Sequence, residues 1–217
     1  MEDVRTISLS LIRHAPTIYP KGTLPPYDPD IDLDGKDEAL SGLAHALPED
    51  AAWLVSPLSR CVKTAEAIAR HGAKVKRMDI IPALEEQRYG DWHGKSVAEI
   101  WDAVKDGPKS NWHFLHPSVT PPNGESFLGL WARITPVIEQ VKAAEDSHIV
   151  VIAHAMVIRA IVGKALNLSA EQALALGVEP LSLTQLTFMA AGASEDKGAG
   201  GAWSLDRLNQ SFPKPLF

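Results

Sequence analysis

Apolar and polar residues alternate most clearly near the amino terminus of the chain. Residues 7–12, ISLSLI, place an apolar side chain at every second position and end in two consecutive apolar residues. This period of two is typical of a β-strand with at least one buried face. Arg13 and His14 follow, and Pro16 biases the backbone before it away from a helix. The pattern therefore predicts a strand whose carboxyl end carries a fixed cation beside an imidazole.

A second apolar run, from Ile149 to Ile152, has no polar interruption, which indicates a central strand covered on both faces. It also ends at a histidine, His154. Further strands are expected at 52–55, 75–81, 181–188 and about 203–208. Helices are expected at 37–47, 96–105, 126–144, 155–166 and 169–176, and a further helix is expected to follow the 56–60 turn and end at about residue 70. This alternation predicts a three-layer α/β/α sandwich with a mostly parallel central sheet and one or two antiparallel strands near the carboxyl terminus.

Two segments are expected to be loop or lid insertions, at about residues 18–36 and 82–123, and the second contains the expected helix at 96–105. The first is rich in proline, glycine and aspartate, and long loops within a compact domain tend to border functional sites. A glycine- and alanine-rich stretch at 190–202 suggests a mobile hairpin connection. At 217 residues the chain is long enough for one well-packed α/β domain, so we expect a single domain over residues 1–217.

Charge and cysteine content narrow the function classes. The chain has 21 basic and 27 acidic residues, and a net charge of −6 argues against a general binder of nucleic acid or anionic membrane. An anionic substrate would need a local positive pocket. The single cysteine, Cys61, excludes an internal disulfide and fits a reducing compartment. Because no signal peptide or membrane span is evident, the expected location is cytoplasmic.

Four motifs, in order along the chain, resemble those of the histidine phosphatase superfamily, in its phosphoglycerate-mutase-like branch. They are RHAPT at 13–17 for the family's RHGxT, SPLSR at 56–60 with TA at 64–65, EQRYGDW at 86–92, and HA at 154–155 for the family's second HG. The resemblance spans about residues 5–190. It implies the phosphoglycerate-mutase-like α/β/α fold and phosphoryl transfer from a small phosphate ester.

By this resemblance, His14 is the expected nucleophile, which takes the phosphoryl group as a phosphohistidine that water then hydrolyses. Arg13, Arg60 and His154 are expected to bind the phosphoryl oxygens, His154 is also counted as catalytic, and Thr17 is a further expected phosphate ligand. Phosphoryl transfer depends mainly on positioning and electrostatic stabilisation, which such a set can supply. No metal and no cofactor are expected.

The expected general acid is Glu86, which stands four residues before Gly90, the spacing of the family's proton donor. A leaving alkoxide needs a proton, and a carboxyl group with a raised pKa can supply it. Glu85 stands one residue earlier and is the alternative.

The chain departs from the family pattern at several positions. Ala15 and Ala155 replace the glycines that usually follow the two histidines, His93 replaces a glutamate, and Pro20 stands where the family usually has asparagine. The family's fifth phosphate ligand is therefore left open, and a donor from residues 21–36 or a backbone amide could substitute.

A metal site at His113 and His116 is an alternative, because their spacing of three suits metal ligands. No carboxylate or cysteine pair nearby completes such a site, so a loop or lid is the favoured interpretation. The other histidines, at 45, 71, 93 and 148, are expected at the surface, and Arg133 and Arg159 are expected to be structural or rim charges.

Three functions remain open. The first is a phosphatase acting on a small phosphorylated metabolite; the second is a phosphoglycerate-type phosphomutase; the third is a non-catalytic, phosphate-binding regulatory relative. Such mutases carry paired arginines in a longer segment after the acid, whereas residues 95–123 contain no arginine, which favours the phosphatase. The 13–17, 90–92 and 124–126 pieces look like those of α-ribazole phosphatases. The expected partner is a small-molecule phosphate ester, with no nucleic acid and no membrane, and a homodimer is left open.

Overall fold

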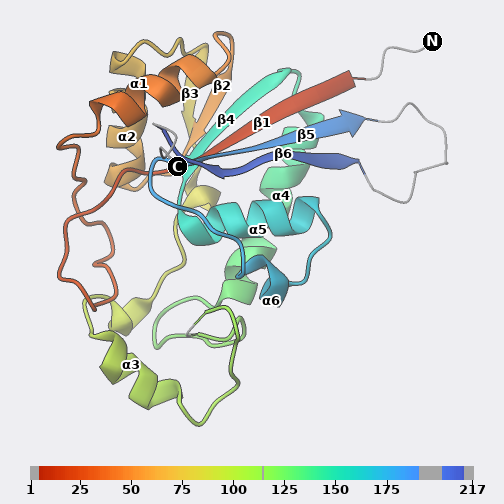
Figure 1. Ribbon diagram of the computed structural model, residues 1–217. Coiled ribbons are helices and arrows are strands. Elements are labelled where there is room, and N and C mark those ends of the chain that lie inside the picture. The colour runs from red at the N-terminus through yellow and green to blue at the C-terminus, as the bar shows by residue number, and fades with distance from the viewer. Residues whose placement is uncertain (1–4, 114, 191–201, 213–217) are drawn as a thin grey trace, which may run out of the picture.

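The computed structural model describes residues 5–113, 115–190 and 202–212 (Figure 1). A six-stranded sheet forms the centre, with the strand order β3-β2-β4-β1-β5-β6. The strands are β1 (Arg5–Arg13), β2 (Ala52–Val55), β3 (Arg77–Ile80), β4 (His148–Ala153), β5 (Leu183–Ala190) and β6 (Trp203–Gln210). The first four in sheet order run parallel, and β5 and β6 pair antiparallel at the other end.

Helices cover both faces of this sheet, and the alternation of side chains along the strands explains why. In β1, Ile7, Leu9 and Leu11 face a core shared with α4 (Phe127–Ala143), α5 (Ala155–Ala165) and α6 (Ala170–Ala173). Ile12, next along the strand, faces the opposite core with α1 (Asp37–Ala46) and α2 (Ser59–Arg70). Figure 1 shows α1 and α2 on one side of the sheet and α4 and α5 on the other. The predicted three-layer fold is confirmed.

The register of the parallel strands determines where the candidate site can form. Arg13 of β1 lies opposite Ala153 of β4, and Val55 of β2 lies opposite Ile152 of β4. The three strands therefore end together, and the residues that follow them emerge at one carboxyl edge. In open α/β sheets this edge is where ligands bind.

Residues 82–113 and 115–122 leave the sheet and include two short 3₁₀ turns, Pro82–Leu84 and Gly90–Trp92, and helix α3 (Val97–Val104). Figure 1 shows α3 well away from the sheet, next to the loop that follows β1. A separate apolar cluster joins these segments, consisting of Leu24, Tyr89, Trp92, Ile100 and Leu115. The two predicted insertions thus pack against each other.

The element bounds agree with the sequence-based expectations except at a few ends. β5 begins at Leu183 rather than at Leu181, because Leu181 has a positive φ of 56°, which a strand does not accommodate. β3 begins at Arg77, and α6 has only four residues. Most of the expected hairpin connection, residues 191–201, lies outside the described residues. Among the helices described, none has the length and apolarity needed to cross a membrane.

Candidate active site

Three polar side chains meet at the carboxyl edge because each directly follows one of three adjacent parallel strands. They are His14 after β1, Ser56 after β2 and His154 after β4. The His14 amide donates to the Ala153 carbonyl, and the Ser56 amide donates to the Ile152 carbonyl, each over 3.0 Å. The hydrogen-bond ladder of the sheet therefore continues one residue past the strands and fixes the backbone of His14 and Ser56.

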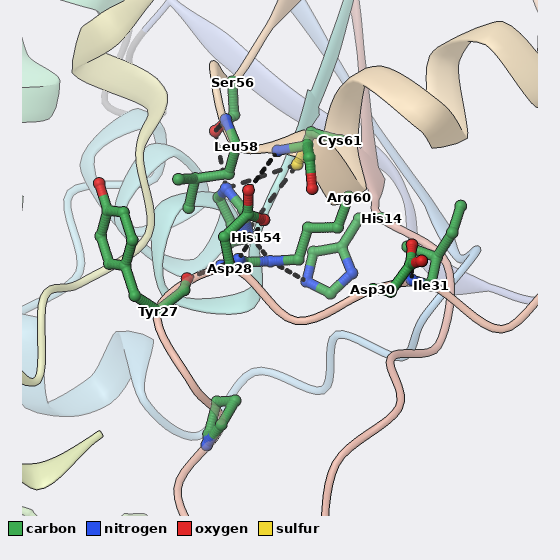
Figure 2. A network of polar contacts seen from close by, with 12 residues as sticks. His14, Tyr27, Asp28, Asp30, Ile31, Ser56, Leu58, Arg60, Cys61 and His154 are labelled. Carbon is green, nitrogen blue, oxygen red and sulfur yellow. Dashed lines mark hydrogen bonds and ion pairs between the residues drawn. The ribbon is translucent and has the colours of Figure 1, made fainter. Parts of the chain in front are cut away.

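Arg60, in the first turn of α2, bridges the two histidines. Its Nε donates to both rings, over 3.3 Å to Nε2 of His14 and over 3.2 Å to Nδ1 of His154. Figure 2 draws both contacts as dashed lines. The two imidazole rings approach edge to face, with centroids 5.1 Å apart. All three side chains are at least nine-tenths buried. One buried guanidinium thus points at two buried imidazoles.

The contacts of His14 show which of its nitrogens carries the proton. Nδ1 lies 2.7 Å from the Ala15 carbonyl oxygen, which only accepts, so Nδ1 carries the proton and donates it there. Nε2 is left with a lone pair that faces Arg60. Burial, followed by the positive charges of Arg60 and Arg13, lowers the pKa of His14 to about 3. The ring is therefore neutral near pH 7, with Nε2 available for attack.

His154 is fully buried and also neutral. Burial, followed by the charge of Arg60, holds the pKa of His154 well below the usual value. Its Nδ1 accepts from Arg60, and its Nε2 lies 2.8 Å from the Ser56 hydroxyl. Ser56 was not named as a site residue in the sequence analysis. Its position directly after a strand, in the Ser-Pro turn, is the signal that could have indicated it.

The loop after β1 supplies further contacts to Arg60. Nη1 of Arg60 donates to the Tyr27 carbonyl over 2.8 Å and to the Asp28 carboxylate over 3.2 Å (Figure 2). The second carboxylate oxygen of Asp28 accepts the Ser59 amide at the start of α2, over 2.9 Å. The predicted 18–36 loop therefore borders this site, and Asp28 was missed because nothing in a proline-rich loop indicates which of its aspartates points inward.

Arg13 projects from the end of β1. Its Nη1 donates to the Val178 carbonyl over 2.7 Å, whereas its buried Nε has no hydrogen-bond partner within the described parts of the chain. An unpartnered buried cationic donor beside His14 suits an anion. Thr17 lies apart from this network: it forms an isolated β-bridge with Ile31, and its hydroxyl makes no hydrogen bond to the residues described.

Glu86 lies within the electric field of this cluster. Its carboxylate accepts the amide of Gln87 over 2.9 Å and, at 3.4 Å, the amide of Met156 in the first turn of α5. Burial raises the pKa of Glu86, although these hydrogen bonds and the charges of Arg60 and Arg13 partly oppose the change. A carboxyl group with a raised pKa beside arginines fits a proton donor. The Glu85 carboxylate instead lies near the half-exposed Tyr27, and its negative charge helps burial to raise the pKa of that phenol.

The backbone that carries Glu86 is held by Arg133 of α4. Nη1 of Arg133 donates to the carbonyls of Ala83 and Glu85, over 2.6 and 3.0 Å. The same guanidinium pairs with both carboxylate oxygens of Glu125, at 3.1 and 2.7 Å. The sequence-based interpretation of Arg133 as a structural charge agrees with this contact, which ties α4 to the segment of the expected acid.

The remaining histidines are not all at the surface as expected. His93 is half-buried: its Nδ1 donates to the Pro25 carbonyl over 2.9 Å, and its Nε2 accepts the Tyr89 amide over 3.1 Å. It therefore joins the two inserted segments. Nδ1 of His116 contacts the Ser118 hydroxyl, and Nδ1 of His113 accepts the Leu115 amide. Within the described ranges, no group of three or more histidine, cysteine or acidic side chains has a metal-binding arrangement.

Comparison with known proteins identifies the family. Residues 9–197 match the family model for the histidine phosphatase superfamily, branch 1. The chain belongs to this superfamily. A glucosyl-3-phosphoglycerate phosphatase of Mycolicibacterium vanbaalenii is 28% identical to it over 226 residues, which cover 96% of each chain.

Solved structures of the superfamily agree with this assignment. The native structure of a mycobacterial glucosyl-3-phosphoglycerate phosphatase superposes with a TM-score of 0.75 at 26% identity, covering 94% of this chain and 99% of that one. A putative alpha-ribazole-5'-P phosphatase from Escherichia coli shares the fold, with a TM-score of 0.73 at 21% identity, covering 94% of this chain and 96% of that one.

Proposed function

We propose that this superfamily member is a phosphomonoesterase that hydrolyses a small phosphorylated metabolite through a phosphohistidine at His14, without a metal ion. The observation that carries the proposal is the position of Arg60 Nε, within 3.3 Å of two neutral imidazole nitrogens. An unprotonated nucleophile beside a fixed, buried cation suits attack on a phosphoryl group.

In the first step, the phosphoryl group of the ester binds against Arg60 and Arg13. The Nε2 lone pair of His14 attacks phosphorus in line with the ester oxygen, a P–N bond forms and the P–O bond breaks. Glu86 donates its proton to the departing oxygen, so the alcohol leaves neutral. The two arginines and His154 stabilise the charge on the equatorial oxygens, which is the main catalytic contribution available to such a site.

In the second step, water hydrolyses the phosphohistidine. Glu86, now a carboxylate, takes a proton from the attacking water, a P–O bond forms and the P–N bond breaks. Inorganic phosphate leaves, and His14 and Glu86 return to their starting forms. Thr17 is retained as a proposed further phosphate ligand only because it ends the RHAPT motif that resembles the family's RHGxT.

A small ester as substrate is supported by the relatives. The similar mycobacterial proteins are named as phosphatases of glucosyl-3-phosphoglycerate, a phosphorylated small molecule. Residues 95–123 contain no arginine that could hold a second acidic group as in the mutases, which favours hydrolysis over transfer back to the substrate. A cytoplasmic location belongs to the same proposal, supported by the single cysteine, which is free and buried.

The test is a panel of phosphate esters, including glucosyl-3-phosphoglycerate, α-ribazole phosphate and 3-phosphoglycerate, assayed for released inorganic phosphate with and without EDTA. We expect at least one ester to be hydrolysed equally well in both conditions by the wild type, and at least about a thousandfold more slowly by His14→Ala. Isomerised phosphoglycerate without release would indicate the mutase. Phosphate binding with no turnover of any ester would indicate a regulatory relative.

A further inference from the structure

The two ring nitrogens of His154 have different partners, which defines the protonation of the ring. Nδ1 lies 3.2 Å from Nε of Arg60, and an arginine can only donate, so Nδ1 must be the unprotonated, accepting nitrogen. The proton of the neutral ring is therefore on Nε2, and Nε2–H donates to the Ser56 hydroxyl over 2.8 Å. Arg60 thus selects one of the two tautomers of His154, and the Ser56 hydroxyl accepts the proton that this tautomer carries.

The Ser56 hydroxyl is held in place from several directions. The residue is fully buried, and its amide donates to Ile152 of β4, on the strand that leads to His154. Its Oγ also lies 3.4 Å from the Leu58 amide, which donates to it. The other group close to Nε2 is Cys61, whose Sγ lies 3.4 Å away and is a weak acceptor. The hydroxyl is therefore the main acceptor for Nε2–H (Figure 2).

We propose that Ser56 is a positioning residue that lets His154 change from an acceptor to a donor at Nδ1 when a phosphoryl group binds; this inference rests on the proposed function. The hydroxyl accepts Nε2–H whether the ring is neutral or cationic, so one side of the ring stays fixed while the other changes. The added proton moves from the P–OH of a monoanionic ester to Nδ1, leaving P–O⁻. For a dianion the proton comes from solvent.

The surroundings of His154 explain why the change would accompany binding. The charged and titratable groups around the ring are Arg60 and Cys61 from α2, Arg13 and His14 from the end of β1, and Arg133 from α4. Burial and, after it, the positive charges of the three arginines hold the pKa of His154 low while the pocket is empty. The negative phosphoryl oxygens offset these charges, and a lone pair on Nδ1 facing them would be repelled. Protonation converts this repulsion into a charge-assisted hydrogen bond.

The imidazolium form has two N–H groups, and both need acceptors in this buried place. In Ser56→Ala the Nε2–H would lose its main acceptor, so the cationic form would be disfavoured most. Leaving a buried donor without a partner lowers an equilibrium constant by roughly tenfold to a hundredfold. We therefore expect phosphate affinity to fall by about that factor in Ser56→Ala, and Ser56→Thr, which keeps the hydroxyl, to restore most of it.

The experiment follows the ¹⁵N signals of the His154 imidazole by NMR, with inorganic phosphate as the probe. The wild type should show the Nε2–H tautomer without phosphate and protonation of both nitrogens with phosphate. At the same pH, Ser56→Ala should not become protonated at both His154 nitrogens when phosphate is added, whereas Ser56→Thr should. Ser41→Ala in α1 is the control, because this serine lies outside the site network and its hydroxyl makes no hydrogen bond to the described residues.

An Nδ1–H tautomer in the phosphate-free wild type would overturn the inference, as would a Ser56→Ala protein whose signals and phosphate affinity match the wild type. Neither readout needs turnover. A wild type that shows the His154 response but hydrolyses no ester would contradict the proposed function and still support the role of Ser56.

Discussion

The Asp28 carboxylate lies 3.2 Å from Nη1 of Arg60, while Nε of the same guanidinium faces the two histidines. Asp28 also accepts the Ser59 amide, so one carboxylate connects the loop after β1, the amino terminus of α2 and the arginine. Because Arg60 is nearly fully buried, its orientation depends on such contacts rather than on solvent. Asp28 therefore orients the cation that the phosphoryl group is proposed to meet.

Asp28→Ala should lower kcat/KM by roughly tenfold, because the buried guanidinium loses a charged partner and its orientation. Asp28→Asn keeps an oxygen that can accept from Arg60 and should lose less. Steady-state kinetics and competition by inorganic phosphate measure the effect. The exposed Asp34→Ala is a control in the same loop. A fully active Asp28→Ala protein would show that Tyr27 and the histidines alone hold Arg60.

Glu86→Gln should slow alkyl phosphates by roughly a hundredfold to ten-thousandfold, and para-nitrophenyl phosphate much less, since that leaving group needs little protonation. The neighbouring Glu85→Gln is the matched control and should be mild, because the Glu85 carboxylate contacts Tyr27 instead. Equal slowing of both esters by Glu86→Gln would assign this residue to binding rather than to proton donation.

The raised pKa of Glu86 also predicts a pH dependence. The first step needs the protonated carboxyl group, so kcat/KM for an alkyl phosphate should fall as the pH rises through this raised pKa. The falling limb should disappear in Glu86→Gln, which cannot titrate. If the limb persists unchanged in that variant, another group supplies the proton.

Arg133→Ala should destabilise the protein by about 1–3 kcal/mol, because two partly buried carbonyls and the Glu125 carboxylate lose their donor. Since Arg133 holds the carbonyls of Ala83 and Glu85, the segment carrying Glu86 should also lose its position. Activity on alkyl phosphates should then fall more than activity on para-nitrophenyl phosphate. Arg207→Ala on the exposed strand β6 is the control for removing an arginine. A stable Arg133→Ala protein with unchanged leaving-group dependence would contradict this role.

The buried histidines predict a loss of stability in acid. The pKa of His14 is lowered to about 3 in the folded protein, whereas an unfolded histidine binds a proton below about pH 6.5. The unfolded state therefore binds more protons in this window, and His14 should reduce the free energy of unfolding by about 1.4 kcal/mol per pH unit as the pH falls from 6.5 towards 3. Urea unfolding at several pH values should show that the free energy of unfolding of His14→Asn depends less steeply on pH than that of the wild type. Identical slopes would mean that His14 is not buried in its neutral form.

Much of the fold could be predicted because its signals are local. The alternation at residues 7–12 and the apolar run at 149–152 define β1 and β4, and the histidines that follow them must meet once the strands pair in parallel. The contacts of Ser56 and Asp28 could not be predicted in this way. Ser56 meets His154 across 98 positions of sequence, through the register of β2 and β4, and Asp28 meets Arg60 through a loop without periodicity.

The position of His93 could not be predicted from the sequence either. An isolated histidine in a loop is usually a surface residue, yet its ring joins the Tyr89 amide to the Pro25 carbonyl. This contact depends on the packing of two insertions, and Pro25 and Tyr89 lie in parts of them that carry no α-helix or strand period. The arrangement of the site is thus determined partly by loop packing, which the pattern of apolar and polar residues does not predict.

The most direct test of the proposed mechanism is to trap the phosphoenzyme. Wild-type protein is mixed with a radioactive phosphate ester that it hydrolyses, quenched in base and digested, and the labelled peptide is identified. The mechanism predicts a base-stable, acid-labile label on His14 in the wild type and no label in His14→Ala. A label on another residue, or one that persists in His14→Ala, would contradict it. The mechanism would also be contradicted if no label were trapped during rapid hydrolysis, and if EDTA abolished this hydrolysis and zinc or magnesium restored it.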